Sequence, residues 1–262
     1  MGKKVQFWED YFLDSERQLH IFVKIMKILI MCGGRGKRLG KFTADIPKPL
    51  IKITPQQTVL EVKIREYLRQ GFQEFILCIG YKGELIRKEV ATFAVDAQFT
   101  FSDAGPDAGI LERLYAARDL FTDQVIMTYG DTFTDIELDQ FIHAHQQSDN
   151  EATIVAGPIE NPFGLVEFNR DNKVTYFKEK PVLNYYIGYA IINTSAFDLI
   201  PPKIITMPDG QGLVTFYKIL IALNKLGVYY HPGIQVTFNT PEELVEARDK
   251  MIRFYTTSEA TT

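Results

Sequence analysis

The 262-residue chain has few of the residues that form covalent or metal-bound scaffolds, with only two cysteines and four histidines. Cys32 and Cys78 lie in apolar, strand-like runs, which is typical of small buried hydrophobic residues and not of a disulfide or metal pair. This usage suits a reducing cytoplasm, which is the compartment we predict. His143 and His145 lie two residues apart in a helical pattern, so they point to different faces and form no metal pair.

Long apolar runs and a large excess of one charge are also missing from the sequence. No apolar run approaches the roughly 20 residues that a membrane-spanning helix needs. The formal net charge of −4 argues against a general nucleic-acid-binding protein. We therefore expect neither a membrane nor a nucleic acid as a partner.

Residues 1–25 are best treated as an N-terminal extension. They contain aromatic residues such as Phe7, Trp8 and Tyr11 but no small-residue cleavage site, so a signal peptide is not expected. The extension could be an added helix, a contact in a homo-oligomer, or an upstream start of little consequence. The sequence leaves these alternatives open.

The rest of the chain alternates between short apolar runs and amphipathic segments. The strand-like runs lie at 27–31, 75–79, 98–101, 124–129, 152–156, 165–168, 173–177, 188–192, 227–230 and 234–238. Helical patterns lie at 58–70, 84–93, 110–120, 137–147, 213–225 and 241–254, and Thr58 is a candidate cap with Glu61 three residues later. Strands separated by helices of ten or more residues indicate βαβ units. We therefore predict one α/β domain over residues 26–262, with a mainly parallel sheet and a more mixed later half.

The most informative segment follows the first strand-like run, where three glycines fall within four residues: Gly33, Gly34 and Gly36. Glycine lets backbone amides approach a ligand closely, and successive amides in such a turn form an anion-binding nest. Three cations follow within a dozen residues: Lys37, Arg38 and Lys48. The spacing fits neither a P-loop nor the dinucleotide-binding fingerprint. The pattern predicts a phosphate-rich ligand, against the alternative of a structural turn with solvated cations.

This segment resembles the signature of the nucleotide-sugar pyrophosphorylases, the sugar-phosphate nucleotidylyltransferases. Their pattern is Gly-Gly-x-Gly-Thr-Arg-Leu, a nearby threonine, and then Pro-Lys-Pro-Leu or Pro-Lys-Pro-Met. The chain has Gly-Gly-Arg-Gly-Lys-Arg-Leu at 33–39, Thr43, and Pro-Lys-Pro-Leu at 47–50, with Lys37 in place of the usual threonine. The resemblance implies a Rossmann-like three-layer sandwich of the GT-A-like nucleotidyltransferase type. It also implies that the glycines, Lys37 and Arg38 bind a nucleotide, and that Arg38 and Lys48 act in catalysis.

Two more segments extend the resemblance in the nucleotide half. The run 124–129 ends in Gly130-Asp131, at the carboxyl end of a strand, where ligands of doubly wound sheets bind. A carboxylate there suits Mg²⁺, and the family has a metal-binding aspartate in a similar place. A turn aspartate that caps the next segment is the alternative. Gly80 and Tyr81, in Ile-Gly-Tyr-Lys-Gly at 79–83, resemble glucose-1-phosphate cytidylyltransferases and are expected near the nucleotide.

The acceptor half resembles the family through Phe-Lys-Glu-Lys-Pro at 177–181. The family's Phe-x-Glu-Lys-Pro segment implies that Glu179 hydrogen-bonds a sugar and that Lys180 meets its phosphate. Gly164 and Gly188 match glycines that lie beside the sugar. A charged hairpin edge with solvated side chains is the alternative for this segment.

Three departures from the cytidylyltransferase pattern concern the acceptor and the metal. Tyr186 stands where the family has a sugar-contacting asparagine, and Ala-Gly-Ile at 108–110 replaces Gly-Gly-Arg, with Arg113 close by. Asn239 stands where an aspartate is the second metal ligand. It keeps an oxygen but loses the charge, so Mg²⁺ should bind more weakly or rely more on phosphate oxygens.

These features predict an Mg²⁺-dependent nucleotidylyltransferase that acts in nucleotide-sugar and polysaccharide biosynthesis. It would transfer CMP from CTP to a phosphorylated acceptor such as a sugar 1-phosphate and release pyrophosphate. Heptose-1-phosphate guanylyltransferases share several of the same motifs. One alternative is a CTP-dependent enzyme for a non-sugar phosphate, such as a phosphorylated amino acid, or for a phosphonate. Another is a catalytically weakened nucleotide-binding regulatory protein, and the base, the acceptor and the oligomeric state stay open.

Overall fold

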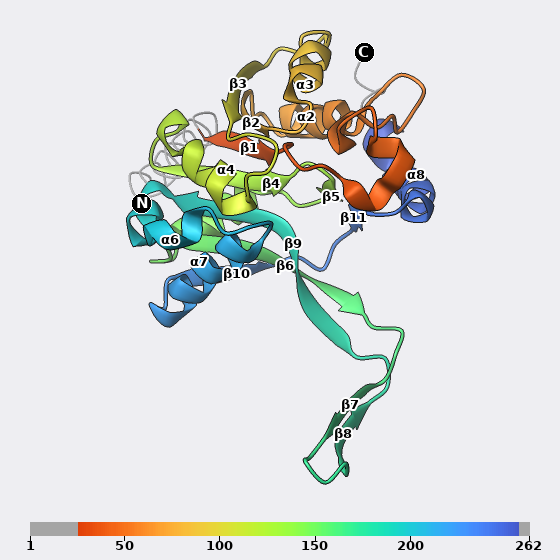
Figure 1. Cartoon of the computed structure of the whole chain (residues 1–262), viewed down its shortest axis with the longest axis vertical. Helices are drawn as coiled ribbons and strands as arrows, with labels where there is room; N and C mark the ends of the chain where they lie inside the picture. The colour runs from red at the N-terminus through yellow and green to blue at the C-terminus, as the bar shows by residue number, and fades with distance from the viewer. Residues whose placement is uncertain (1–25, 257–262) are drawn as a thin grey trace, which may run out of the picture.

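A computed structural model describes residues 26–256 of the chain, and the expected N-terminal extension, residues 1–25, lies outside the described residues. Within that part, a seven-stranded sheet has the order β10-β6-β9-β4-β1-β2-β3 (Figure 1). Its strands are β1 Lys27–Met31, β2 Glu74–Ile79, β3 Gln98–Asp103, β4 Gln124–Tyr129, β6 Ala152–Glu160, β9 Val182–Asn193 and β10 Leu226–Tyr230. Strand β9 pairs antiparallel with β4 and β6, whereas the other neighbours pair parallel. The predicted mixed, mainly parallel sheet is confirmed.

Helices cover both faces of this sheet (Figure 1). On one face lie α2 Val59–Arg69, α3 Gly83–Val90 and α5 Leu138–Gln146, and on the other α4 Ile110–Ala116, α6 Pro202–Ile205 and α7 Gln211–Ala222. Side chains alternate along β1, so Ile28 and Ile30 pack under α2 while Leu29 packs toward α4. The fold is therefore the predicted three-layer sandwich.

A third apolar cluster lies beside the main sheet. The antiparallel strands β5 Thr132–Thr134 and β11 Gln235–Thr237 and the helix α8 Pro241–Thr256 build it. Leu39 from the segment after the glycines and Phe238 from the end of β11 are both buried in it. Short 3₁₀ turns complete the body: η1 Lys37–Thr43, η2 Lys48–Leu50, η3 Arg118–Leu120 and η4 Thr194–Leu199. The cluster brings chain segments near residues 39 and 239 close together.

A hairpin arm projects from the body (Figure 1). It consists of β7 Leu165–Phe168 and β8 Val174–Lys178, which pair only with each other in the described sheets, and it continues the extended ends of β6 and β9. Every residue from 166 to 180 is exposed. None of the helices within residues 26–256 has the length and apolar character that crossing a membrane requires.

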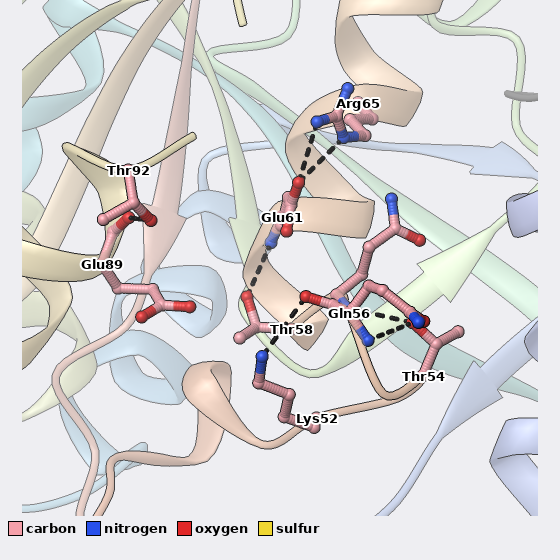
Figure 2. Close-up of polar contacts among 9 residues, drawn as sticks. Lys52, Thr54, Gln56, Thr58, Glu61, Arg65, Glu89 and Thr92 are labelled. Atoms are coloured by element: carbon pink, nitrogen blue, oxygen red, sulfur yellow. Dashed lines mark hydrogen bonds and ion pairs between the residues drawn. The ribbon is translucent and has the colours of Figure 1, made fainter. Parts of the chain in front are cut away.

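The start of α2 shows how local sequence fixes a helix end (Figure 2). Thr58 is the N-cap, and its Oγ1 accepts a hydrogen bond from the backbone N–H of Glu61 at 3.3 Å. The Glu61 carboxylate accepts from the Arg65 guanidinium at 2.8 Å, one turn further along the helix. The predicted Thr58 cap is confirmed, although Glu61 is used for an i,i+4 ion pair.

We expect Thr58→Ala to lower the free energy of unfolding by about 1 kcal/mol, because the Glu61 amide loses its cap. Thr58→Ser is the matched control, since it keeps the hydroxyl. Urea unfolding of both variants measures the difference. An alanine variant that unfolds like the serine variant would contradict this account of the helix start.

Candidate active site

A cavity of about 720 Å³ lies at the carboxyl ends of β1 and β4. Its lining includes eight of the predicted nucleotide-binding, catalytic and metal-binding residues: Gly33, Gly34, Gly36, Lys37, Arg38, Lys48, Asp131 and Asn239. Five cationic side chains line it, against three carboxylates (Arg35, Lys37, Arg38, Lys48 and Arg113; Asp107, Asp131 and Asp209). The excess of positive charge suits an anionic ligand.

Gly36 fixes the shape of the glycine-rich loop. Its φ is +60°, and a Cβ there would lie 2.9 Å from Cγ2 of Thr43. The carbonyl oxygen of Gly36 accepts from Thr43 Oγ1 and from the backbone N–H of Leu39, both at 2.9 Å. The Thr43 side chain therefore stabilises the loop through this hydrogen bond. The left-handed backbone at position 36 explains why a glycine is there.

Arg113 of α4 is a site residue that sequence reasoning left without a role. The residue is 4% exposed, and its side chain donates from Nη1 to the Ile79 carbonyl at 2.6 Å and from Nη2 to the Gly33 carbonyl at 3.2 Å. Burial lowers the pKa of this guanidinium below its usual value. A Cβ on Gly33 would lie 2.1 Å from Nη1, and one on Gly80 would lie 2.4 Å from the same atom. Both glycines thus make room for Arg113.

Tyr81 supports the loop from outside the cavity lining, and Gly80 is also absent from that lining. The Tyr81 backbone N–H donates to the Gly33 carbonyl at 3.1 Å, and its hydroxyl donates to the Ala44 carbonyl at 3.1 Å. The guanidinium of Arg35 stacks 5.3 Å from the Tyr81 ring centroid. The structure thus places Tyr81 against the back of the loop, and contact with a nucleotide stays a prediction.

Lys48 joins three segments at the floor of the cavity. Its side chain is 11% exposed, and Nζ lies 2.5 Å from Asp131 Oδ2 and donates to the Phe238 carbonyl. Nζ also lies 4.7 Å from the centroid of the Phe238 ring. Asn239 follows directly and lines the cavity, with its backbone N–H donating to Glu243 Oε2 at 2.6 Å.

The oxygen donors at this floor are compatible with Mg²⁺. Residues 26–251 contain no cluster of three or more His, Cys, Asp or Glu side chains that could hold a metal by themselves. Mg²⁺ commonly binds through one or two carboxylates together with substrate phosphates. The Asp131 carboxylate and the Asn239 amide, both on the cavity, fit such a site when phosphates complete it.

The expected acceptor residues are not gathered at the cavity. Glu179 and Lys180 follow β8 on the exposed arm, and Gly164 precedes β7. A Cβ on Gly164 would lie 3.3 Å from Glu179 Oε2, so these two residues are neighbours on the arm. None of the three lines the cavity, and their roles stay predictions.

Tyr186 and Gly188 lie on β9, behind the cavity wall. Gly188 has φ +80°, and a Cβ there would lie 2.8 Å from the ring of Tyr129, which lines the cavity. The ring of Tyr186 meets that of Tyr129 edge-on at 5.9 Å, and its hydroxyl lies 3.3 Å from the Tyr217 hydroxyl. Burial raises the pKa of Tyr186 above its usual value and raises that of Tyr129 to about 12.

Comparisons with known proteins find a matching family and similar sequences. The model of the nucleotidyl transferase family matches residues 27–200. A probable glucose-1-phosphate cytidylyltransferase of Bacillus subtilis is 30% identical over 246 residues, which cover 84% of this chain and 94% of that protein. The glucose-1-phosphate cytidylyltransferase of Salmonella typhimurium is 27% identical, with coverage of 84% and 93%.

Solved structures share the fold at lower sequence identity. A putative glucose-1-phosphate thymidylyltransferase from Bacillus anthracis, in complex with a sucrose, superimposes with a TM-score of 0.67 at 16% identity, covering 86% of this chain and 94% of that one. HddC from Yersinia pseudotuberculosis, complexed with GMP-PN, gives 0.63 at 20% identity, with coverage of 86% and 99%.

We expect Gly33→Ala to lower the free energy of unfolding by about 1–3 kcal/mol, because the new Cβ displaces Arg113 and leaves buried polar groups unpaired. Gly34→Ala is the matched control, since nothing lies within 4 Å of its Cβ position. It should change stability by no more than about 0.5 kcal/mol. Chemical denaturation of both variants is the measurement, and equal losses would contradict the packing role of Gly33.

Proposed function

This chain belongs to the nucleotidyl transferase family, and on that basis we propose that it transfers CMP from CTP to a sugar 1-phosphate. Sugar-phosphate nucleotidyl transfer is the general activity that the family match and the relatives support. CTP as the donor is favoured by the two glucose-1-phosphate cytidylyltransferase relatives. The observation that most supports the proposal is the cation-lined cavity that joins the glycine-rich loop, Lys48 and Asp131.

The reaction needs positioning and charge neutralisation more than acid–base chemistry. A phosphate oxygen of the acceptor attacks the α-phosphorus of CTP, and the bond to the bridging oxygen breaks as pyrophosphate leaves. The nucleophile is already an anion, so no general base is required. Backbone amides of the loop at Gly33, Gly34 and Gly36 would bind the triphosphate. Arg38 and Lys48 would stabilise charge on the transferred and leaving groups.

Mg²⁺ is proposed as the cofactor, held by Asp131 and Asn239. When bound, it would neutralise charge on the phosphates of both substrates. Lys48 already neutralises one oxygen of Asp131, whereas among the described side chains Oδ1 has a hydrogen bond from the Thr132 hydroxyl alone, at 3.4 Å. Oδ1 is therefore held less strongly by protein hydrogen-bond donors than Oδ2 is, which leaves it more available to a metal ion. Because Asn239 is neutral, substrate phosphates should provide much of the metal affinity.

Two alternatives each have a supporting observation. A non-sugar phosphate or phosphonate acceptor, such as a phosphorylated amino acid, is favoured because Glu179 and Lys180 do not line the cavity and Tyr186 replaces an amide. A regulatory protein that binds nucleotide without turnover is favoured by the neutral Asn239. Acceptor screening tests the first alternative, and product formation tests the second.

The decisive assay measures pyrophosphate release with Mg²⁺ for the four ribonucleoside triphosphates and dTTP, each against a panel of acceptors. The panel contains hexose and heptose 1-phosphates, phosphorylated amino acids and a phosphonate. We expect release with CTP and a hexose 1-phosphate. Turnover with only a non-sugar acceptor would replace the sugar in the proposal. Nucleotide binding without release from any pair would instead support the regulatory protein.

We expect Arg38→Ala to lower kcat roughly 100- to 1000-fold, because a preorganised charge on the phosphates is lost. Because Arg38 is exposed, the thermal unfolding midpoint of the Arg38→Ala variant should equal that of the wild-type protein. Lys41→Ala removes an exposed cation of the same turn that does not line the cavity, and it should keep wild-type kcat. Lys48→Ala should lower kcat by a similar factor. It should also lower the free energy of unfolding, since the Asp131 carboxylate and the Phe238 carbonyl lose their hydrogen-bond donor. Near-normal turnover by Arg38→Ala would refute its assignment.

A further inference from the structure

Lys63 is a buried cation on the inner face of α2. The residue is 1% exposed, and it shares that face with the buried residues Leu60, Ile64 and Tyr67. Its ammonium donates to the backbone carbonyl of Thr132 and, at 2.9 Å, to the hydroxyl of Tyr189. Within residues 26–251 no carboxylate forms an ion pair with it. A buried ammonium without a counter-charge is costly, so this position needs other compensation.

Aromatic rings supply that compensation. The ammonium lies 4.8 Å from the ring centroid of Tyr189, 5.2 Å from that of Phe133 and 5.3 Å from that of Tyr67. Ring faces attract a cation at these distances, most strongly when water is excluded. The Tyr67 hydroxyl also bonds the Tyr189 hydroxyl at 3.0 Å and the Thr128 hydroxyl at 3.2 Å. The network therefore ties α2 to β4, β5 and β9.

The carbonyl that Lys63 holds belongs to the residue directly after Asp131. On the amino-terminal side, the Gly130 amide donates to the Met31 carbonyl at 3.1 Å, which fixes the turn to β1. On the carboxyl-terminal side, Thr132 is fixed by Lys63 and, at 3.3 Å, by the Tyr189 hydroxyl. Asp131 is thus the middle residue of a short segment anchored at both ends, and its side chain is held by Lys48.

We propose that Lys63 is a positioning residue for nucleotidyl transfer, which fixes the backbone that aims the Asp131 carboxylate into the cavity. The inference rests on the proposed role of Asp131. An apolar residue of similar length would fill the same space at no desolvation cost, so packing alone does not explain a lysine here. Outer partners that orient a functional carboxylate typically change metal affinity or activity by about 10- to 100-fold when they are lost.

The test compares Lys63→Met, which keeps the length but removes the donor and the charge, with Lys63→Gln, which keeps a donor. Tyr67→Phe is the matched control, because it removes a hydroxyl of the same network and leaves the Lys63–Thr132 bond. For each variant we would measure the thermal midpoint, kcat and KM for CTP. Amide hydrogen exchange of residues 130–134 without nucleotide or metal gives a readout independent of activity.

We expect Lys63→Met to stay folded and to lose roughly 10- to 100-fold in kcat, with KM for CTP within about threefold of wild type. Exchange at 130–134 should become faster, Lys63→Gln should be intermediate, and Tyr67→Phe should stay close to wild type in kcat. Wild-type kcat in Lys63→Met would overturn the inference. So would a kcat loss that only follows the folded fraction, or an increase confined to KM. If Lys63→Met does not fold, Lys63→Gln decides: a partial loss of kcat together with faster exchange at 130–134 would support the inference, and wild-type values of both would overturn it.

Failure of the proposed function has a different signature from failure of this inference. A wild-type protein inactive with every donor and acceptor would refute the proposed function. Amide exchange at 130–134 would then still show whether Lys63 fixes this segment. Unchanged exchange in Lys63→Met and Lys63→Gln would show that it does not. An active wild type with unaffected Lys63 variants would refute the inference alone.

Discussion

Lys48 connects parts of the chain that are 83 and 190 residues apart, through Asp131 and the Phe238 carbonyl. Because its ammonium lies between these groups, the glycine-rich loop, the end of β4 and the segment after β11 face one cavity. The Lys48 ammonium is nearly buried, and its partners are a carboxylate and a backbone carbonyl. If one partner is lost, a charged or polar group is left unpaired where little water can solvate it. The remaining features of the site, including the loop held by Arg113 and the segment held by Lys63, surround this junction.

The charges of the site follow a common arrangement. Arg113 and Lys63 are buried and bonded to backbone carbonyls, whereas Arg38 and Lys37 are exposed on the cavity. The buried cations therefore fix the positions of main-chain segments, and the exposed cations are available to a ligand. Lys48 combines both features, because it is nearly buried and holds Asp131 and the Phe238 carbonyl, and it also lines the cavity. The protein has a net charge of −4, whereas its cavity is lined by five cationic side chains and three carboxylates.

The sheet and most helices were predictable from the sequence, because apolar runs bounded by turns have clear periods, as for β4 at Gln124–Tyr129. The glycine-rich loop and Asp131 follow parallel strands that end at one edge of the sheet, whereas Lys48 and Asn239 were named from the family resemblance; all of them line one cavity, and their roles stay predictions. The three-residue strand β5 was missed, because it is too short to show a period. The buried positions of Lys63 and Arg113 depend on tertiary contacts that a helical pattern does not reveal. The pairing of β6 with β9 shifts register between Ile154 and Ala156, which alternation along a strand does not specify.

The arm also has a topological consequence. Strand β9, which follows the arm in the chain, lies in the sheet between β4 and β6, which both precede it, and β10 then pairs with the outer side of β6. The chain segments before and after the arm are thus interleaved in the sheet. Strand β9, after the arm, lies between β4 and β6, and β6, before the arm, lies between β9 and β10. A break in the exposed hairpin would separate the covalent chain into two pieces without separating the folded body. The tip of the arm is therefore a natural position for dividing the protein into complementing fragments or for joining new termini.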